Sequence, residues 1–123
     1  MKEIKVIEAS IKNELSILKN LINENYDINE RDERGLTSLH YAVAQGHSEV
    51  VKLLIENGAE IDSLDTNGNT PLNDAVFHSK GDPTIIRILL KAGADPNYKN
   101  FYGVSPEKLA ETIANYNLAK YLK

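Results

Sequence analysis

The chain of 123 residues contains no cysteine and no tryptophan, and only 7% of its residues are aromatic. The lack of cysteine excludes disulfide bridges and thiolate metal sites. No apolar run approaches the 18 residues or so that a membrane-spanning helix needs. Residues 1–8 include acidic side chains and lack the apolar centre of a secretory signal. These absences predict a cytoplasmic protein without a membrane partner.

A block of basic residues is also missing. Lys and Arg number 14 against 18 Asp and Glu, so the formal net charge is −4, and the two signs are interleaved along the chain. A nucleic-acid-binding domain usually carries a basic face, so we expect no nucleic-acid partner. Hydrophobic residues make up 41% of the chain, which is enough for one domain that buries most of its apolar surface.

The most informative feature that is present is a repeat. Residues 32–42 read D-E-R-G-L-T-S-L-H-Y-A, and residues 65–75, which lie 33 positions later, read D-T-N-G-N-T-P-L-N-D-A. Each copy is followed by an apolar run that ends in Gly-Ala, at positions 58–59 and 93–94. A fixed period of this length predicts stacked units that bury apolar faces against their neighbours.

Each unit is expected to hold a turn and two helices. The Asp-x-x-Gly segments predict the turn, and Thr37 and Thr70 are favourable N-caps for a first helix. Gly46 and Gly81 are expected to end the two first helices. The apolar stripe of the second helix begins at Val50 in one copy and Ile85 in the other. Pro83 is expected to open that later helix, and Gly58 and Gly93 to end the second helices in the left-handed conformation.

The chain is identified on these residues as a member of the ankyrin repeat family. Residues 35–42 and 46–59 resemble the family pattern G-x-T-P-L-H-x-A-A-x-x-G-H-x-E-V-V-x-L-L-L-x-x-G-A almost position by position. The resemblance implies an all-α solenoid of helix-turn-helix units joined by β-hairpin-like turns. It also implies that His40 makes hydrogen bonds between units, and that His47 belongs to the turn between helices.

The repeat frame extends outward into weaker copies, which predicts one domain over residues 1–123. The expected units are an N-terminal capping repeat (1–31), a second repeat (32–64), a third repeat (65–99) and a truncated C-terminal capping repeat (100–123). The third unit is two residues longer, because Ala75 to Ile85 spans 10 positions where Ala42 to Val50 spans 8. With a cap at each end, we expect the chain to be complete.

No pattern of catalytic residues stands out in the chain. There is no Gly-rich phosphate loop, no Gly-x-Ser-x-Gly motif and no nucleophile with a base placed beside it. His40 and His47 are separated by a helix break and do not form a zinc pair on one helix. We therefore predict no enzyme activity, no catalytic residue, no cofactor and no metal site.

The resemblance implies that the hairpin tips and the first helices line a concave face that binds another protein. Phe101 and Tyr102 are the strongest candidates, because neighbouring aromatics at a tip offer a large apolar contact. The alternative is that one of them folds inward onto the third unit or onto Tyr98. The full set of predicted contact residues is Arg31, Glu33, Arg34, Thr66, Asn67, Phe77, His78, Lys99, Phe101 and Tyr102. For Arg31 and Arg34 the alternative is local pairing with Asp32, Glu30 or Glu33.

The predicted function is non-catalytic binding of a partner protein, which is inhibited or stabilised sterically. Residues 103–116 and the lengthened segment 75–81 are also similar to small bacterial ankyrin proteins, some of which are immunity proteins encoded beside toxins. A toxin or an enzyme is therefore a candidate partner, and the free protein is expected to be a monomer. The alternative function is that of a scaffold or self-associating protein, in which exposed aromatics pair two copies.

Overall fold

The computed structural model describes residues 4–113 and 117–123 and confirms the all-α solenoid. Within these residues the chain forms seven α-helices and one 3₁₀ helix, and no strand. The helices come in pairs: α1 (Lys5–Ile11) with α2 (Leu15–Asn23), α3 (Ser38–Gln45) with α4 (Ser48–Glu56), α5 (Pro71–His78) with α6 (Thr84–Lys91), and α7 (Pro106–Thr112) with the 3₁₀ helix η1 (Ala119–Tyr121).

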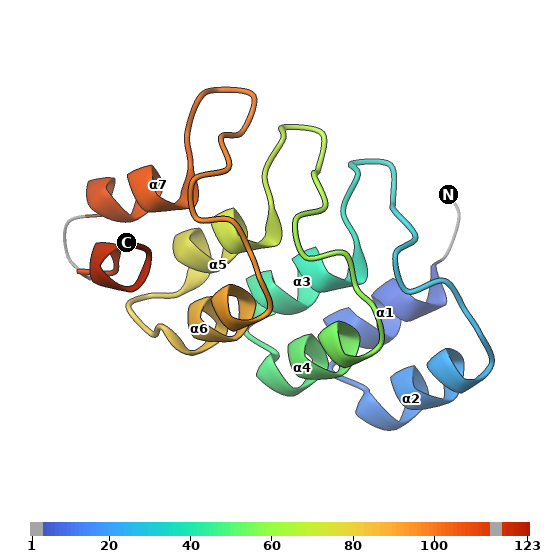
Figure 1. Ribbon diagram of the computed structural model, residues 1–123. Helices are drawn as coiled ribbons and strands as arrows, with labels where there is room; N and C mark the ends of the chain where they lie inside the picture. The colour runs from blue at the N-terminus through green and yellow to red at the C-terminus, as the bar shows by residue number, and fades with distance from the viewer. Residues whose placement is uncertain (1–3, 114–116) are drawn as a thin grey trace.

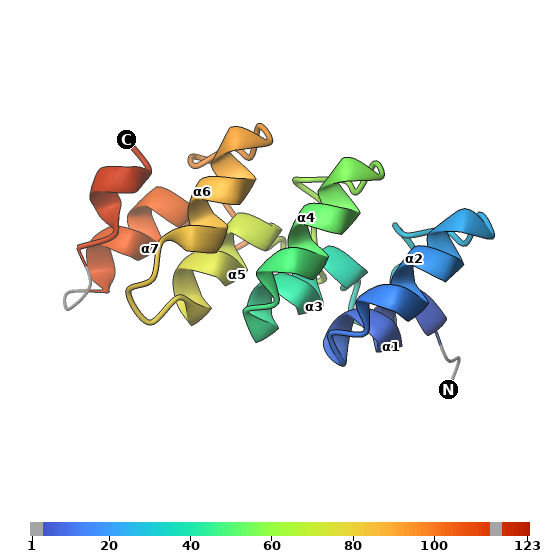
Figure 2. The same ribbon diagram turned by 90° about the horizontal axis from the view of Figure 1, so that it is seen from below.

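The helix pairs stack in one direction and place the two ends of the chain at opposite ends of the molecule (Figure 1). The first helices α1, α3, α5 and α7 contact one another in that order and form one layer. The second helices form the other layer, as the view from below shows (Figure 2). Three long hairpin loops project to the same side of the stack. We call the face formed by the first helices and these hairpins the inner face.

One continuous apolar core runs along the stack. Leu21, Leu54 and Leu89 hold equivalent places in the second helices, and each is buried. The buried side of the first helices includes Leu39 and Leu72, which are also almost inaccessible. Because every unit covers the apolar face of the next, stability is shared between neighbours along the stack.

In each hairpin, one side-chain oxygen accepts hydrogen bonds from the backbone and stabilises the turn. Asp32 Oδ1 accepts hydrogen bonds from the backbone N–H groups of Arg34 (2.9 Å) and Leu36 (3.0 Å). Asp65 and Asn100 accept two backbone N–H groups in the same way in the hairpins that follow. These bonds explain why a short polar side chain begins each turn.

Two capping residues and one histidine tie the first helices into the stack. The Thr37 hydroxyl accepts from the backbone N–H of His40 (3.3 Å), and His40 Nδ1 accepts from the N–H of Thr37 (3.2 Å). With Nδ1 acting as acceptor, Nε2 carries the proton and donates to the backbone oxygen of Asn69 at 3.2 Å. His40 therefore joins the second unit to the third, as the resemblance implied, and Thr70 repeats the N-cap in α5.

The lengthened third unit differs from two expectations. Helix α5 ends at His78, so Gly81 does not cap it. Pro83 is the N-cap of α6, not its first residue, and the Asp82 carboxylate accepts from the N–H of Thr84 (3.0 Å). The two extra residues make a separate turn between the helices, in which Lys80 and Gly81 both have positive φ. Gly81 still breaks the chain between the two helices, and Pro83 opens α6 from the position just before its first residue.

The fourth unit carries only a short second helix. The 3₁₀ helix η1 stands in the expected place of a longer α-helix, and the neighbouring Leu118 and Leu122 are buried. Residues 1–3 of the predicted N-terminal unit and residues 114–116 of the predicted fourth unit lie outside the described residues. The exact unit boundaries stay a prediction.

A matched pair of glycine substitutions tests how tightly the hairpin tips pack. Gly46 (φ +76°) and Gly68 (φ +78°) share the left-handed conformation, but an added Cβ meets no atom within 4 Å at Gly46. At Gly68 it would lie 2.6 Å from the Phe101 ring. We expect Gly46→Ala to lower the free energy of unfolding by about 1 kcal/mol. Gly68→Ala should cost roughly 1–3 kcal/mol more in urea denaturation. Equal losses would show that Phe101 does not pack on Gly68.

Candidate protein-binding site

All ten predicted contact residues are exposed, and they divide between the hairpins and the end of one helix. The first hairpin (24–37) carries Arg31, Glu33 and Arg34; the second (57–70) carries Thr66 and Asn67; the third (92–105) carries Lys99, Phe101 and Tyr102; and the last turn of α5 carries Phe77 and His78. The structure places them all where a partner can reach them. Their role in binding stays a prediction.

The strongest apolar feature of the inner face is a set of three exposed aromatics. Phe77, Phe101 and Tyr102 are 67%, 69% and 76% exposed. The Phe101 ring packs against Gly68 of the preceding hairpin, and the Phe101 N–H donates to the backbone oxygen of Asn67 (3.1 Å). Phe101 thus touches the third unit, as the alternative proposed, yet it leaves most of its ring accessible.

Arg31 and Arg34 are held by hydroxyl groups. Arg31 Nη2 donates to Ser63 Oγ (3.0 Å) in the next hairpin, and Arg34 Nη2 donates to the Tyr41 hydroxyl (3.2 Å). That hydroxyl in turn donates to the Asp32 carboxylate. Hydroxyl groups therefore orient the two guanidinium groups, and both arginines remain exposed.

Burial favours the neutral form of Asp32, but its hydrogen bonds have the larger combined effect. The Tyr41 hydroxyl and the N–H groups of Leu36 and Arg34 stabilise the ionised carboxylate and lower the pKa of Asp32. The first hairpin therefore keeps a fixed negative charge next to Arg34. This arrangement holds the arginine in a preformed position on the inner face.

A groove lies between the third and fourth units on the inner face, and sequence reasoning missed it. Its volume is about 470 Å³. The residues that line it come from α5, α7 and the two hairpins above them: Asn69, Asn73, Asp74, Phe77, His78, Asn100, Tyr102, Val104 and Leu109. It therefore joins two predicted contact residues of α5 to Tyr102 at the neighbouring tip.

Asp74 is the unusual group in this groove. It is partly buried, and its pKa is raised to about 7, mainly by burial and further by the negative charge of Asp65. Asn73 beside it is 3% exposed, and its Oδ1 has no hydrogen-bond partner among the described residues. A signal for both residues was present in the repeat, because Asn73 and Asp74 occupy the places of His40 and Tyr41 in the preceding copy.

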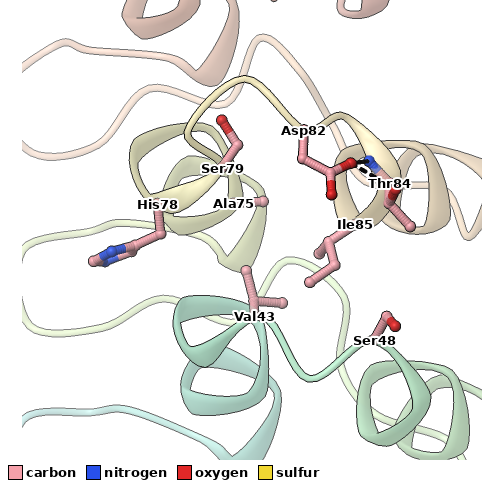
Figure 3. Close-up of a pocket in the computed structure, with 9 residues that line it drawn as sticks. Val43, Ser48, Ala75, His78, Ser79, Asp82, Thr84 and Ile85 are labelled. Atoms are coloured by element: carbon pink, nitrogen blue, oxygen red, sulfur yellow. Dashed lines mark hydrogen bonds between the residues drawn. The ribbon is translucent and has the colours of Figure 1, made fainter.

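The two-residue lengthening forms a second, smaller pocket. It has a volume of about 130 Å³ and lies between the α5–α6 loop and the turn between α3 and α4. Figure 3 shows Val43, Ala75 and Ile85 around a common centre, with the Asp82 to Thr84 hydrogen bond at the edge. The His78 ring is directed away from this pocket. His78 thus borders this pocket and also lines the groove on the inner face.

Residues 4–113 and 117–123 contain no group of three or more His, Asp or Glu side chains placed to hold a metal ion. No helix in that part of the chain is both long enough and apolar enough to cross a membrane.

The stacked helix pairs, the hairpins aligned on one side and the exposed aromatics define a helical-repeat protein of the kind that binds other proteins through an extended face. Residues 6–100 match the family described as "Ankyrin repeats (3 copies)". The chain therefore belongs to the ankyrin repeat family, whose fold is a protein–protein interaction module and is generally non-catalytic.

Relatives of the chain come from animals, a plant and a fission yeast. It is 33% identical over 96 residues to human BCL-6 corepressor-like protein 1, a match that covers 78% of this chain and 5% of that protein. It is 40% identical over 91 residues to the chicken nuclear factor NF-kappa-B p105 subunit, a match that covers 72% of this chain and 9% of that protein. It is 44% identical over 77 residues to mouse protein phosphatase 1 regulatory subunit 27, a match that covers 63% of this chain and 49% of that protein. The chain thus spans less than half of the length of each of these relatives.

Proposed function

We propose that this chain is a non-catalytic, cytoplasmic binding module that holds a partner protein against its hairpin tips and inner face. Binding inhibits or stabilises the partner by covering part of its surface. The observation that carries the proposal is the exposed aromatic pair Phe101 and Tyr102, fixed at the tip of the last hairpin. Two of the relatives have names that fit such a role, a corepressor-like protein and a phosphatase regulatory subunit.

The aromatic pair is suited to binding because its backbone is already ordered. The Phe101 N–H is bonded to the preceding hairpin, and the Tyr102 N–H donates to Asn100 Oδ1 at 2.9 Å. A partner that covers these rings gains apolar burial worth roughly 25 cal/mol per Å². It loses little conformational entropy in return, because the hairpin is preorganised.

We expect Phe101→Ala to weaken partner binding by about 2 kcal/mol or more, or roughly 30-fold, as removal of an aromatic hot spot does. The melting temperature should change little, because the ring is mostly exposed. The test is calorimetric titration with the partner captured from native cells, with Lys91→Ala in α6 as the control variant.

Lys91 is exposed in the second helices, in the layer opposite the inner face, so its removal should leave the affinity unchanged. If Phe101→Ala instead unfolds the protein, Phe101 is a core residue and the site is misplaced. Unchanged affinity in that variant would exclude this hairpin tip from the interface.

A toxin is the more specific partner that we propose. The similarity of residues 103–116 and 75–81 to small bacterial ankyrin proteins supports an immunity role, in which the module blocks the toxin's active surface. A pull-down from the native host should recover the product of a neighbouring toxin gene. If it recovers no toxin and no such gene lies nearby, the immunity role is rejected.

Self-association is the second candidate function, and the same exposed aromatics favour it. Two copies could bury Phe77, Phe101 and Tyr102 against each other. Light scattering at micromolar concentration separates the two functions. We expect a monomer, which removes the scaffold hypothesis; a stable dimer that Phe101→Ala dissociates would replace the proposal above.

A further inference from the structure

The groove between α5 and the last hairpin combines an unpaired carboxylate with aromatic side chains. The Asp74 carboxylate makes no hydrogen bond or ion pair with the described residues, and no lysine or arginine is among the side chains that line the groove. Phe77 and Tyr102 line it from different elements and are both largely exposed. A partly buried acid with no cation beside it is costly for the folded protein alone.

The amide groups around Asp74 are arranged so that one acceptor is left over. Asn73 Nδ2 donates to Asn69 Oδ1 (3.1 Å) and to the backbone oxygen of Val104 (3.4 Å). Asn100 Nδ2 also donates to Asn69 Oδ1, at 2.8 Å. These partners fix the orientation of the Asn73 amide, because a flipped amide would set its oxygen against two acceptors. Asn73 Oδ1 then remains as a buried acceptor with no partner.

The charged surroundings of Asp74 add no competing cation. Asp65 in the preceding hairpin is the other charged group that perturbs it, and no charged side chain from α3, α6 or α7 does so among the described residues. His78 and Tyr102 are the remaining titratable groups that line the groove. A ligand that matches this set must supply positive charge and hydrogen-bond donors, and it must tolerate contact with aromatic rings.

We propose that this groove receives an arginine side chain of the partner protein, with Asp74 as its counter-ion and Phe77 and Tyr102 against the guanidinium. Arginine fits better than lysine, because its planar group stacks on aromatic rings and presents several donors to a carboxylate and a neighbouring amide oxygen. The net charge of −4 is consistent with a basic partner surface. This inference rests on the proposed binding function and names the chemistry of the partner.

Arginine binding in the groove is expected to depend on pH. The pKa of Asp74 is raised to about 7 by burial and by Asp65, so roughly nine-tenths of the carboxylate is ionised at pH 8 and about one-tenth at pH 6. Only the ionised form attracts the guanidinium. The apparent affinity should therefore fall about tenfold between pH 8 and pH 6.

The test is an NMR titration of the full chain with N-acetyl-arginine-N-methylamide. At pH 8 we expect saturable shifts of the Asn73, Asp74 and Tyr102 amides with a dissociation constant in the millimolar range. The neutral citrulline analogue should cause no such shifts, and the lysine analogue should bind more weakly. Asp74→Asn should abolish the response. Glu56→Gln, the same carboxylate-to-amide change on the exposed side of α4 and outside the groove, is the matched control and should keep both the binding and its pH dependence.

The inference is wrong if the citrulline analogue gives the same shifts, if Asp74→Asn binds as well as the unmodified chain, or if lysine binds equally well. These outcomes are separate from a failure of the proposed function. Loss of partner binding in Phe101→Ala without an Asp74-dependent arginine response would keep the interface and reject this occupant. An Asp74-dependent arginine response together with unchanged partner binding in Phe101→Ala would keep the arginine site and reject the interface at the hairpin tip.

Discussion

Replacing Leu54 with alanine is expected to lower the free energy of unfolding by about 2–5 kcal/mol. Leu54 is fully buried in α4 and belongs to the continuous core along the stack. Truncation removes apolar contacts and leaves a cavity that the neighbouring helices fill only in part. Since small domains have about 5–15 kcal/mol of stability in total, the variant should lose a large share of it in urea denaturation.

Lys52→Ala is the matched control for Leu54→Ala, two positions away in the same helix. Lys52 is exposed, and its ion pair with Glu49 spans 3.5 Å between exposed side chains. Such pairs contribute little, so the control should stay within about 0.5 kcal/mol of the unmodified protein. A loss below about 1 kcal/mol for Leu54→Ala would mean that the units do not share a packed core.

Asp74→Asn is expected to stabilise the protein at pH 8 and to have almost no effect near pH 4. The pKa of Asp74 is raised from its ordinary value of 3.8 to about 7, chiefly by burial. Between these two values the folded state holds more protons than the unfolded state, so the Asp74 contribution to stability falls as pH rises. Asparagine has nearly the same shape and carries no charge to bury. We expect it to gain about 1–3 kcal/mol at pH 8, below the ceiling of roughly 4 kcal/mol that the pKa difference sets.

Asp82→Asn is a control for which we expect the opposite change in the free energy of unfolding. The side-chain and backbone hydrogen bonds from Thr84 lower the pKa of Asp82. Its contribution is therefore present above the ordinary pKa of 3.8 and lost as pH falls through the lower folded value. We expect Asp82→Asn to destabilise the protein at pH 7. Thermal melts of both variants between pH 4 and pH 8 make the comparison, and a destabilised Asp74→Asn at pH 8 would show that the carboxylate has a stabilising partner.

Because the ionised Asp74 carboxylate is expected to lower the free energy of unfolding, we infer that its role lies outside folding. An acid that costs the folded protein free energy is kept for reasons other than stability, and functional sites are where such groups collect. His40 is buried as well, and burial lowers its pKa, so its contribution falls as pH drops through the region below 6.5. It has a hydrogen-bonded place between two units. The contrast separates a titratable group with a structural partner from one for which we propose a binding role.

The repeat in the sequence predicted most of the fold, because each frame residue has a local physical task. Thr37 was predicted as an N-cap and Gly58 as a left-handed helix end from local sequence patterns, and the family resemblance implied the inter-unit bond of His40. The structure confirms all three. Asn13 stands where Gly46 lies in the next unit, and its φ of +59° is also in the left-handed region. These features follow from short-range chemistry that a single unit contains.

The groove could not be predicted in the same way, because it depends on contacts between units. The frame shows that Asp74 replaces Tyr41, but only the packing of the last hairpin beside α5 makes it a partly buried acid. The exact last residue of α5 and the exact first residue of α6 were not predicted, for a related reason. The two added residues formed their own turn through Lys80 and Gly81, which the shorter unit does not contain.

The central claim is that the inner face and hairpin tips bind the partner, and a comparison of two surfaces tests it most directly. The affinity of the captured partner is measured by calorimetry for the double variant Phe101→Ala/Tyr102→Ala and for Lys52→Ala/Lys91→Ala on the opposite layer. We predict that the first variant loses binding at least 30-fold while remaining folded, and that the second binds like the unmodified chain. Full binding by the tip variant, with loss in the opposite-layer variant, would contradict the account.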